Sequence, residues 1–189
     1  MNDIKLIITD FDGTLVDTFE ANFRAYERAF SLNKIEISRE QYLACFGFRF
    51  DRFMDAMQVW DESIRSSIRE IKGNVYPDYF DCLIPNKTLI SLIQHFKESG
   101  GKVAIASTAR LKNLMNVLGY LGLLDFFDLI LTGDDVKKGK PDPEIYLSVL
   151  EKLGIEPGHA LIFEDAQIGF EAATAAGVQF IPVNANYFV

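Results

Sequence analysis

The spacing of apolar residues divides the chain into a helical segment and a segment of alternating strands and helices. Between residues 17 and 84, apolar side chains recur at three- and four-residue intervals, which places them on one face of a helix. Four helices are expected: one from a cap at Asp17 or Thr18 through Phe30, one after the Ser38–Gln41 capping box, one over 50–59 and one after Asp61. No strand is expected within 17–84.

From residue 85 onward, short apolar runs alternate with helical repeats, as they also do at the start of the chain. The expected strands are 4–8, 102–106, 128–131, 159–163 and 178–183, and the expected helices are 86–98, 111–118, 143–153 and 168–176. Such alternation predicts an α/β fold with a doubly wound parallel sheet. We therefore expect a core domain of residues 1–16 and 85–189 that carries an inserted, all-helical domain of residues 17–84.

Composition excludes several classes of protein. The chain has 189 residues, a net charge of -8 and a sequence pI of about 4.8, so it lacks the basic surface that nucleic-acid binding needs. No apolar run reaches the ~18 residues of a membrane span, and no signal peptide is recognised. Cys45 and Cys82 are too few for a disulfide framework. We expect a cytoplasmic protein, either a monomer or a weak homodimer.

Two carboxylates follow the first strand. Asp10 and Asp12 lie two residues apart in a turn that also contains Gly13. Like charges this close raise one another's pKa unless a cation neutralises them, and a hard cation such as Mg²⁺ suits carboxylate oxygens. The alternative is that both residues merely form the turn, because Asp and Gly are common turn residues.

Polar side chains also follow three later strands. Ser107 and Thr108 come after the second strand of the core, Lys140 lies in the turn after the third, and Glu164 and Asp165 come after the fourth. Ligands bind such sheets outside the carboxyl ends of the strands, so these groups are expected to converge. Taken singly, the Ser-Thr pair could cap the next helix and the lysine could be a solvated loop residue.

These motifs, in this order, resemble those of the haloacid dehalogenase superfamily. Asp-Phe-Asp-Gly-Thr-Leu-Val-Asp-Thr at 10–18 looks like its first signature, and Ser107 matches the second motif. Lys140 in Gly-Lys-Pro-Asp-Pro matches the third, and Glu164-Asp165 the fourth. The helical insertion resembles the small cap of the phosphoglycolate phosphatase and β-phosphoglucomutase branch. The resemblance covers essentially the whole chain.

The resemblance implies a role for each catalytic residue. Asp10 would be the nucleophile that attacks phosphorus, and Asp12 would protonate the leaving oxygen and later activate water. Ser107 and Thr108 would bind phosphoryl oxygens, and Lys140 would offset negative charge. Dehalogenases of the superfamily lack the second aspartate, so Asp12 favours phosphoryl transfer over dehalogenation.

The resemblance also implies a metal site. Mg²⁺ would bind Asp10, the backbone carbonyl of Asp12 and Asp165, with Glu164 as a ligand or an outer-sphere partner. Ala166 departs from the serine that often follows the acidic pair in this branch, so the support of Asp165 is expected to differ here.

One loop of the insertion interrupts the helical pattern. It contains Gly47, Phe48 and Arg49, with Arg52 close behind, and combines a flexible glycine with aromatic and cationic groups. In capped relatives such a loop selects the substrate, so we expect these residues to recognise the leaving group. The alternative is an ordinary surface loop.

The expected function is Mg²⁺-dependent hydrolysis of a small phosphorylated metabolite, a phosphate monoester, through an aspartyl-phosphate. A phosphomutase of the β-phosphoglucomutase type is the first alternative, since it shares this core and cap. An inorganic pyrophosphatase and a non-catalytic phosphate-binding protein are further alternatives.

Overall fold

The computed structural model describes residues 3–188, which form two compact units. The core unit comprises the described residues up to Asp17 and those from Ile84 onward, and the helical unit comprises Thr18–Leu83. The boundaries expected from the sequence, 16/17 and 84/85, lie one residue away from these. Within residues 3–188, no helix has both the length and the apolar character needed to cross a membrane.

The core unit is built on a five-stranded parallel sheet in the order β5-β4-β1-β6-β7. Its strands are β1 (Leu6–Thr9), β4 (Lys102–Ala106), β5 (Leu129–Leu131), β6 (Ala160–Glu164) and β7 (Gln179–Pro182). The central strand β1 is buried along its whole length, which its apolar run indicates. The prediction of a parallel α/β sheet is confirmed.

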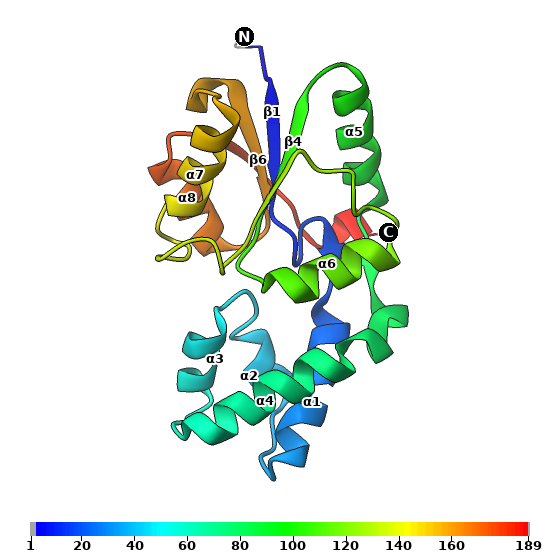
Figure 1. Ribbon diagram of the computed structural model, residues 1–189, viewed down its shortest axis with the longest axis vertical. Helices are drawn as coiled ribbons and strands as arrows, with labels where there is room; N and C mark the ends of the chain where they lie inside the picture. The colour runs from blue at the N-terminus through cyan, green and yellow to red at the C-terminus, as the bar shows by residue number, and fades with distance from the viewer. Residues whose placement is uncertain (1–2, 189) are drawn as a thin grey trace. The chain divides into compact units, whose positions relative to one another are not determined.

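Four helices cover this sheet, with α5 (Lys87–Glu98) and α6 (Leu111–Tyr120) on one side and α7 (Glu144–Leu153) and α8 (Gln167–Ala175) on the other (Figure 1). The side chain of Asn86 caps α5 by accepting a hydrogen bond from Leu89 N at 3.0 Å, as the sequence predicts. Short 3₁₀ turns at Pro157–His159 and Ala185–Phe188 complete the unit.

The order of the strands creates a switch point beside β1. After β1 the chain continues to β4 and β5 on one side, and it then returns to β6 and β7 on the other. The register pairs Thr9 with Phe163, so Asp10 and Glu164 follow as neighbours at the carboxyl ends of β1 and β6. A crevice at such a point is where ligands bind in open α/β sheets.

The helical unit packs aromatic side chains between its helices. It contains α1 (Phe19–Leu32), α2 (Arg39–Leu43), α3 (Phe50–Ala56), α4 (Glu62–Val75) and a 3₁₀ segment η1 (Tyr76–Cys82). The capping box is confirmed: Ser38 Oγ accepts from Gln41 N, and Gln41 Oε1 accepts from Ser38 N. Asp61 caps α4 by accepting from Ser63 N and Ile64 N.

The expectation that residues 17–84 contain no strand is wrong at both ends. Val16–Asp17 (β2) pairs antiparallel with Ile84–Pro85 (β3), which joins the two points where the chain leaves and re-enters the core unit. Strands of two residues are too short to produce an alternating pattern, so periodicity cannot detect them. The α3 helix also ends at Ala56, three residues before the expected end.

Candidate active site

Asp10 lies at the carboxyl end of the central strand. Its backbone N–H donates to Phe163 O at 2.9 Å, which continues the β1–β6 ladder by one residue, and the residue is only 6% exposed. Burial and the nearby Glu164 raise the pKa of the Asp10 carboxyl well above its usual value, although Lys140 opposes the shift.

Lys140 bridges two carboxylates from different strands. Its Nζ lies 2.6 Å from Asp10 Oδ1 and 2.6 Å from Glu164 Oε2. Burial lowers the pKa of the ammonium, but the charges of Asp10 and Glu164 together outweigh this, so the pKa lies well above its usual value. The lysine therefore stays charged at any physiological pH, and it is not a solvated loop residue.

The loop that carries Lys140 is fixed by two other carboxylates. At its start, Asp135 Oδ2 accepts from both Thr132 N and Thr132 Oγ1, at 2.8 and 2.9 Å. Further along, Glu144 accepts the backbone N–H groups of Lys137 and Lys138, each at 2.9 Å. These bonds hold the loop and leave Lys140 to point into the cluster of carboxylates.

Glu164 ends β6 and has both oxygens occupied. Its Oε2 accepts from Lys140 Nζ and from the Tyr146 hydroxyl, each at 2.6 Å. Its Oε1 accepts from the backbone N–H groups of Asp165 and Ala166, each at 3.2 Å. Four bonds use the in-plane lone pairs of a carboxylate, so a further partner would have to displace one of these donors.

Asp165 is held differently. Its Oδ1 accepts from the Thr14 hydroxyl at 2.8 Å, whereas its Oδ2 accepts no donor among residues 3–188. A Cβ atom at Gly13 would lie 2.3 Å from that Oδ2, and Gly13 also has a φ of +89°, so only glycine fits there. Burial first, and then Glu164, raise the pKa of Asp165 to about 7, against the bond from Thr14.

The residues fit a divalent cation. Carboxylate oxygens of Asp10, Glu164 and Asp165 lie within 4.8 Å of one another, and of these three residues Glu164 already has four donors on its oxygens. When ionised, the three carboxylates outnumber the one ammonium of Lys140 by two negative charges, and the site is largely buried. Hard oxygen ligands and this excess of negative charge suit an ion such as Mg²⁺.

Asp12 and Ser107 lie in the segments beside this cluster. Asp12 forms a bridge with Val16 in the tight loop after β1, and its carboxylate is not part of the acidic cluster found among the described residues. Ser107 is buried at the end of β4, and its Oγ accepts from Ala109 N at 3.0 Å. Ser107 and Thr108 do not cap α6, because Arg110 occupies the cap position of that helix.

The residues expected to select the substrate belong to the helical unit. Gly47 ends a turn with a φ of +85°, and Arg49 occupies the N-cap position of α3. The Arg52 guanidinium lies 3.9 Å from the centroid of the Phe48 ring, a cation–π contact. The structure therefore places these residues in one short segment, and their expected role in recognition stays a prediction.

Two residues that shape the site, Tyr146 and Gly169, belong to no catalytic motif and are not among the site residues predicted from the sequence. Tyr146 of α7 is fully buried and binds Glu164. A Cβ atom at Gly169 of α8 would lie 2.0 Å from Glu164 Cδ, so this glycine makes room for the carboxylate. A glycine inside an apolar helical repeat was the one available signal, because it often marks a close approach.

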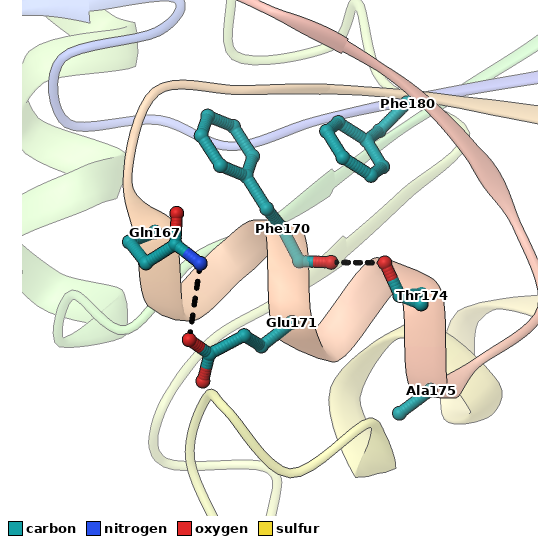
Figure 2. A pocket seen from close by; sticks show the side chains of 6 residues that line it. All are labelled: Gln167, Phe170, Glu171, Thr174, Ala175 and Phe180. Carbon is teal, nitrogen blue, oxygen red and sulfur yellow. Dashed lines mark hydrogen bonds between the residues drawn. The ribbon is translucent and has the colours of Figure 1, made fainter.

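A separate open groove of about 460 Å³ lies along α8 and β7 (Figure 2). The rings of Phe170 and Phe180 stack there with centroids 5.0 Å apart. Its polar groups bind one another or the backbone: Gln167 donates to Glu171 at 3.1 Å, and Thr174 donates to Phe170 O at 2.8 Å. The groove offers no convergent catalytic groups.

Comparison with known proteins agrees with this geometry. The haloacid dehalogenase-like hydrolase family matches residues 7–183. The chain is 32% identical over 184 residues to a phosphorylated carbohydrates phosphatase of Thermotoga maritima, covering 94% of this chain and 84% of that protein. It is 25% identical to a β-phosphoglucomutase of Bacillus subtilis, covering 93% of this chain and 81% of that one.

The fold is also similar to that of a solved structure. CbbY from Rhodobacter sphaeroides, crystallised in complex with phosphate, superposes with a TM-score of 0.84 at 27% identity, covering 97% of this chain and 88% of that one. The family match spans almost all of the described residues and includes every strand end that carries a site residue. The chain therefore belongs to the haloacid dehalogenase-like hydrolases and is an enzyme of the phosphatase type.

Proposed function

We propose that the chain hydrolyses a small phosphate monoester through a phosphoaspartate at Asp10. The observation that carries this proposal is the state of the Asp10 carboxylate. Its Oδ1 is bound by Lys140 at 2.6 Å, and its Oδ2 accepts no donor among the described residues. Attack on phosphorus requires a nucleophile that is held in a fixed orientation and has an oxygen available to form the new bond. Asp10 meets both requirements, because Lys140 holds its Oδ1 and no described donor occupies its Oδ2.

In the first step, Asp10 bonds to phosphorus while the bond from phosphorus to the leaving oxygen breaks. Asp12 gives its proton to that oxygen, and the alcohol departs. In the second step, Asp12 takes a proton from water, whose oxygen attacks phosphorus. Inorganic phosphate leaves and the Asp10 carboxylate is restored. Lys140 holds Asp10 in position and offsets negative charge, and the Ser107 hydroxyl is proposed to donate to a phosphoryl oxygen, with Thr108 beside it.

We assign the cation to Asp10, Asp165 and the backbone carbonyl of Asp12. Mg²⁺ bound there would act as a Lewis acid toward a phosphoryl oxygen. Glu164 belongs in the outer shell in this proposal, because four donors already occupy its oxygens. Asp12 then has a separate task in proton transfer, which its absence from the acidic cluster supports.

The proposed substrate class is phosphorylated sugars. The named activities of relatives that align over most of this chain support it: phosphorylated carbohydrates in Thermotoga maritima and fructose-1-phosphate in Escherichia coli. Phosphate release should be measured over sugar phosphates, phosphoglycolate, nucleotides and pyrophosphate. We expect turnover of sugar phosphates that EDTA abolishes and that added Mg²⁺ restores. Turnover that survives EDTA, or release from pyrophosphate alone, would contradict the proposal.

A phosphomutase is the second candidate, because the match to a β-phosphoglucomutase also spans most of this chain. The same Asp10 chemistry serves both reactions, and they differ in whether water or a sugar hydroxyl accepts the phosphoryl group. The test is to incubate β-glucose 1-phosphate with a catalytic amount of a glucose bisphosphate. Formation of glucose 6-phosphate would indicate a mutase, and release of phosphate would indicate a phosphatase.

The loop of Gly47, Phe48 and Arg49 is proposed to recognise the leaving group. The cationic Arg49 would suit a phosphorylated sugar, and Arg52 lies on the Phe48 ring beside it. Replacing Arg49 by Ala should change the ranking of substrates across the panel while leaving the rate with p-nitrophenyl phosphate within about twofold. An unchanged ranking would contradict this role.

Two expectations about the whole protein also stay predictions. We expect a cytoplasmic protein that is a monomer or a weak homodimer. Light scattering coupled to size-exclusion chromatography would test the second expectation, and a stable oligomer larger than a dimer would contradict it.

A further inference from the structure

Tyr146 places one polar atom inside an otherwise apolar part of the core. The residue is fully buried on α7, in a cluster with Leu6, Ile8 and Ala104 of the neighbouring strands. Its hydroxyl donates to Glu164 Oε2 at 2.6 Å. A phenylalanine would fill the same volume and would need no partner, so packing alone does not account for the hydroxyl.

The hydroxyl acts on an oxygen that competes for Lys140. The ammonium lies 2.6 Å from both Glu164 Oε2 and Asp10 Oδ1, so it is shared evenly between the two carboxylates. Donation from Tyr146 to Oε2 satisfies part of the negative charge on that atom and weakens its hold on the ammonium. Without this donor, Lys140 would be drawn toward Glu164 and away from Asp10.

Glu164 also packs against helix α8, at Gly169. Gly169 lets the carboxylate pack closely against α8, because a Cβ atom at this position would lie 2.0 Å from Glu164 Cδ and no larger residue fits there. The Lys140 ammonium also lies 5.0 Å from the centroid of the Tyr146 ring, so ring and hydroxyl both contact the same ion pair. Tyr146 is therefore in contact with both the carboxylate and the ammonium of this ion pair.

We propose that Tyr146 is a positioning residue, whose hydroxyl holds Glu164 so that Lys140 stays on the nucleophile Asp10. The expected effect of Tyr146 on turnover rests on the proposed function. Its expected effect on the position of the Lys140 ammonium is independent of that function. Tyr146 touches neither substrate nor metal in this proposal and acts only through Glu164 and Lys140.

The kinetic experiment compares Tyr146→Phe with the wild-type enzyme at saturating Mg²⁺. We expect kcat to fall about tenfold while KM stays within about twofold, because one positioning hydrogen bond is lost and no substrate contact changes. Val149→Ala serves as the control, since Val149 is fully buried on the same helix and has no polar atom. It should lower the melting temperature and leave kcat unchanged.

The second measurement needs no activity. The Lys140 ammonium should give a slowly exchanging ¹H–¹⁵N signal in the metal-free protein, identified by its absence in Lys140→Arg. We expect Tyr146→Phe to shift this signal and Val149→Ala to leave it in place. An unshifted signal, or an unchanged kcat in an active Tyr146→Phe enzyme, would overturn the inference. If no phosphate ester is turned over, the proposed function fails and the NMR signal alone decides the inference.

Discussion

Two buried clusters affect the stability of this protein in opposite ways. In the core unit, the Lys140 ammonium binds Asp10 and Glu164, Asp165 belongs to the same acidic cluster, and the pKa values of Asp10 and Asp165 are both raised. In the helical unit, the Phe53 ring packs against three other aromatic rings: Tyr26, Phe30 and Tyr42, with centroids 4.9 to 5.8 Å away.

The difference separates stability from chemistry. Each ring of the aromatic cluster gains contact area and removes apolar surface from water, so every member stabilises the fold. The carboxylates instead lose hydration and repel one another, so they destabilise the metal-free protein at neutral pH. We expect a bound cation to offset the cost of the carboxylate cluster, whereas the aromatic cluster stabilises the fold directly.

The largest effect is expected for the nucleophile. Asp10→Asn should reduce turnover of p-nitrophenyl phosphate by at least about 10⁴-fold, because an amide does not attack phosphorus. The melting temperature should not fall, since the substitution removes one of three crowded carboxylates. Residual activity within tenfold of the wild type would contradict the assigned role, and a large loss of stability would contradict the contrast between the clusters.

The next effect is expected in the helical unit. Phe53→Ala should lower the free energy of unfolding by about 3–5 kcal/mol, because it opens a cavity among aromatic rings. Urea unfolding followed by circular dichroism measures this loss. Phe53→Leu is the matched control and should lose less, since it keeps most of the apolar volume. A loss below about 1 kcal/mol for the alanine variant would show that the aromatic cluster is not a main source of stability.

Asp165 should make the stability of the metal-free protein depend on pH. Its pKa is about 7 in the folded protein, against about 4 in an unfolded chain. Between these values the folded state binds the additional proton, so the contribution of Asp165 to stability is lost as the pH rises from about 4 to about 7, and it changes no further above that range. Asp165→Asn should remove this loss and be more stable than the wild type at pH 8 by on the order of 2–4 kcal/mol.

Mg²⁺ provides the control for this prediction. Saturating Mg²⁺ at pH 8 should raise the melting temperature of the wild type, because the cation binds the folded state only. It should not raise that of Asp165→Asn. Parallel pH profiles of the two metal-free proteins would contradict the account of Asp165.

The smallest effect is expected for an ion-pair network on the surface. Glu20 binds Arg24 Nε at 2.7 Å and Arg39 Nη1 at 2.5 Å, and about half of each arginine side chain is exposed. Glu20→Gln should shift the melting temperature by less than about 3 °C, and the shift should shrink with added salt. A larger shift would show that charge as well as aromatic packing stabilises the helical unit.

The sequence predicts the charged members of the site because each follows a strand. Asp10, Lys140, Glu164 and Asp165 could be placed together once a parallel sheet was expected, since the ends of its strands meet at one edge. Tyr146 could not, because nothing in the pattern distinguishes it from an ordinary core residue of α7. Its role depends on a distance of 2.6 Å between atoms 18 residues apart in sequence.

Two short strands of the fold also have no signature in the sequence. The long helices and the core strands repeat often enough to be recognised, whereas the two-residue strands β2 and β3 do not. The distinction between Glu164 and Asp165 is equally hidden in the sequence. Among residues 3–188, four donors reach the Glu164 carboxylate and one reaches that of Asp165, a difference that depends on the three-dimensional arrangement of the donors.

The most direct test of the central claim is chemical trapping of the phosphorylated residue. The enzyme is quenched during turnover of a sugar phosphate with Mg²⁺ and reduced with borohydride, which converts a phosphoaspartate to homoserine. Mass spectrometry of the peptide containing Asp10 should then show homoserine at position 10, only when substrate is present and never in Asp10→Asn. Rapid turnover with no modified residue, or homoserine at Asp12 or Asp165 instead, would contradict the account.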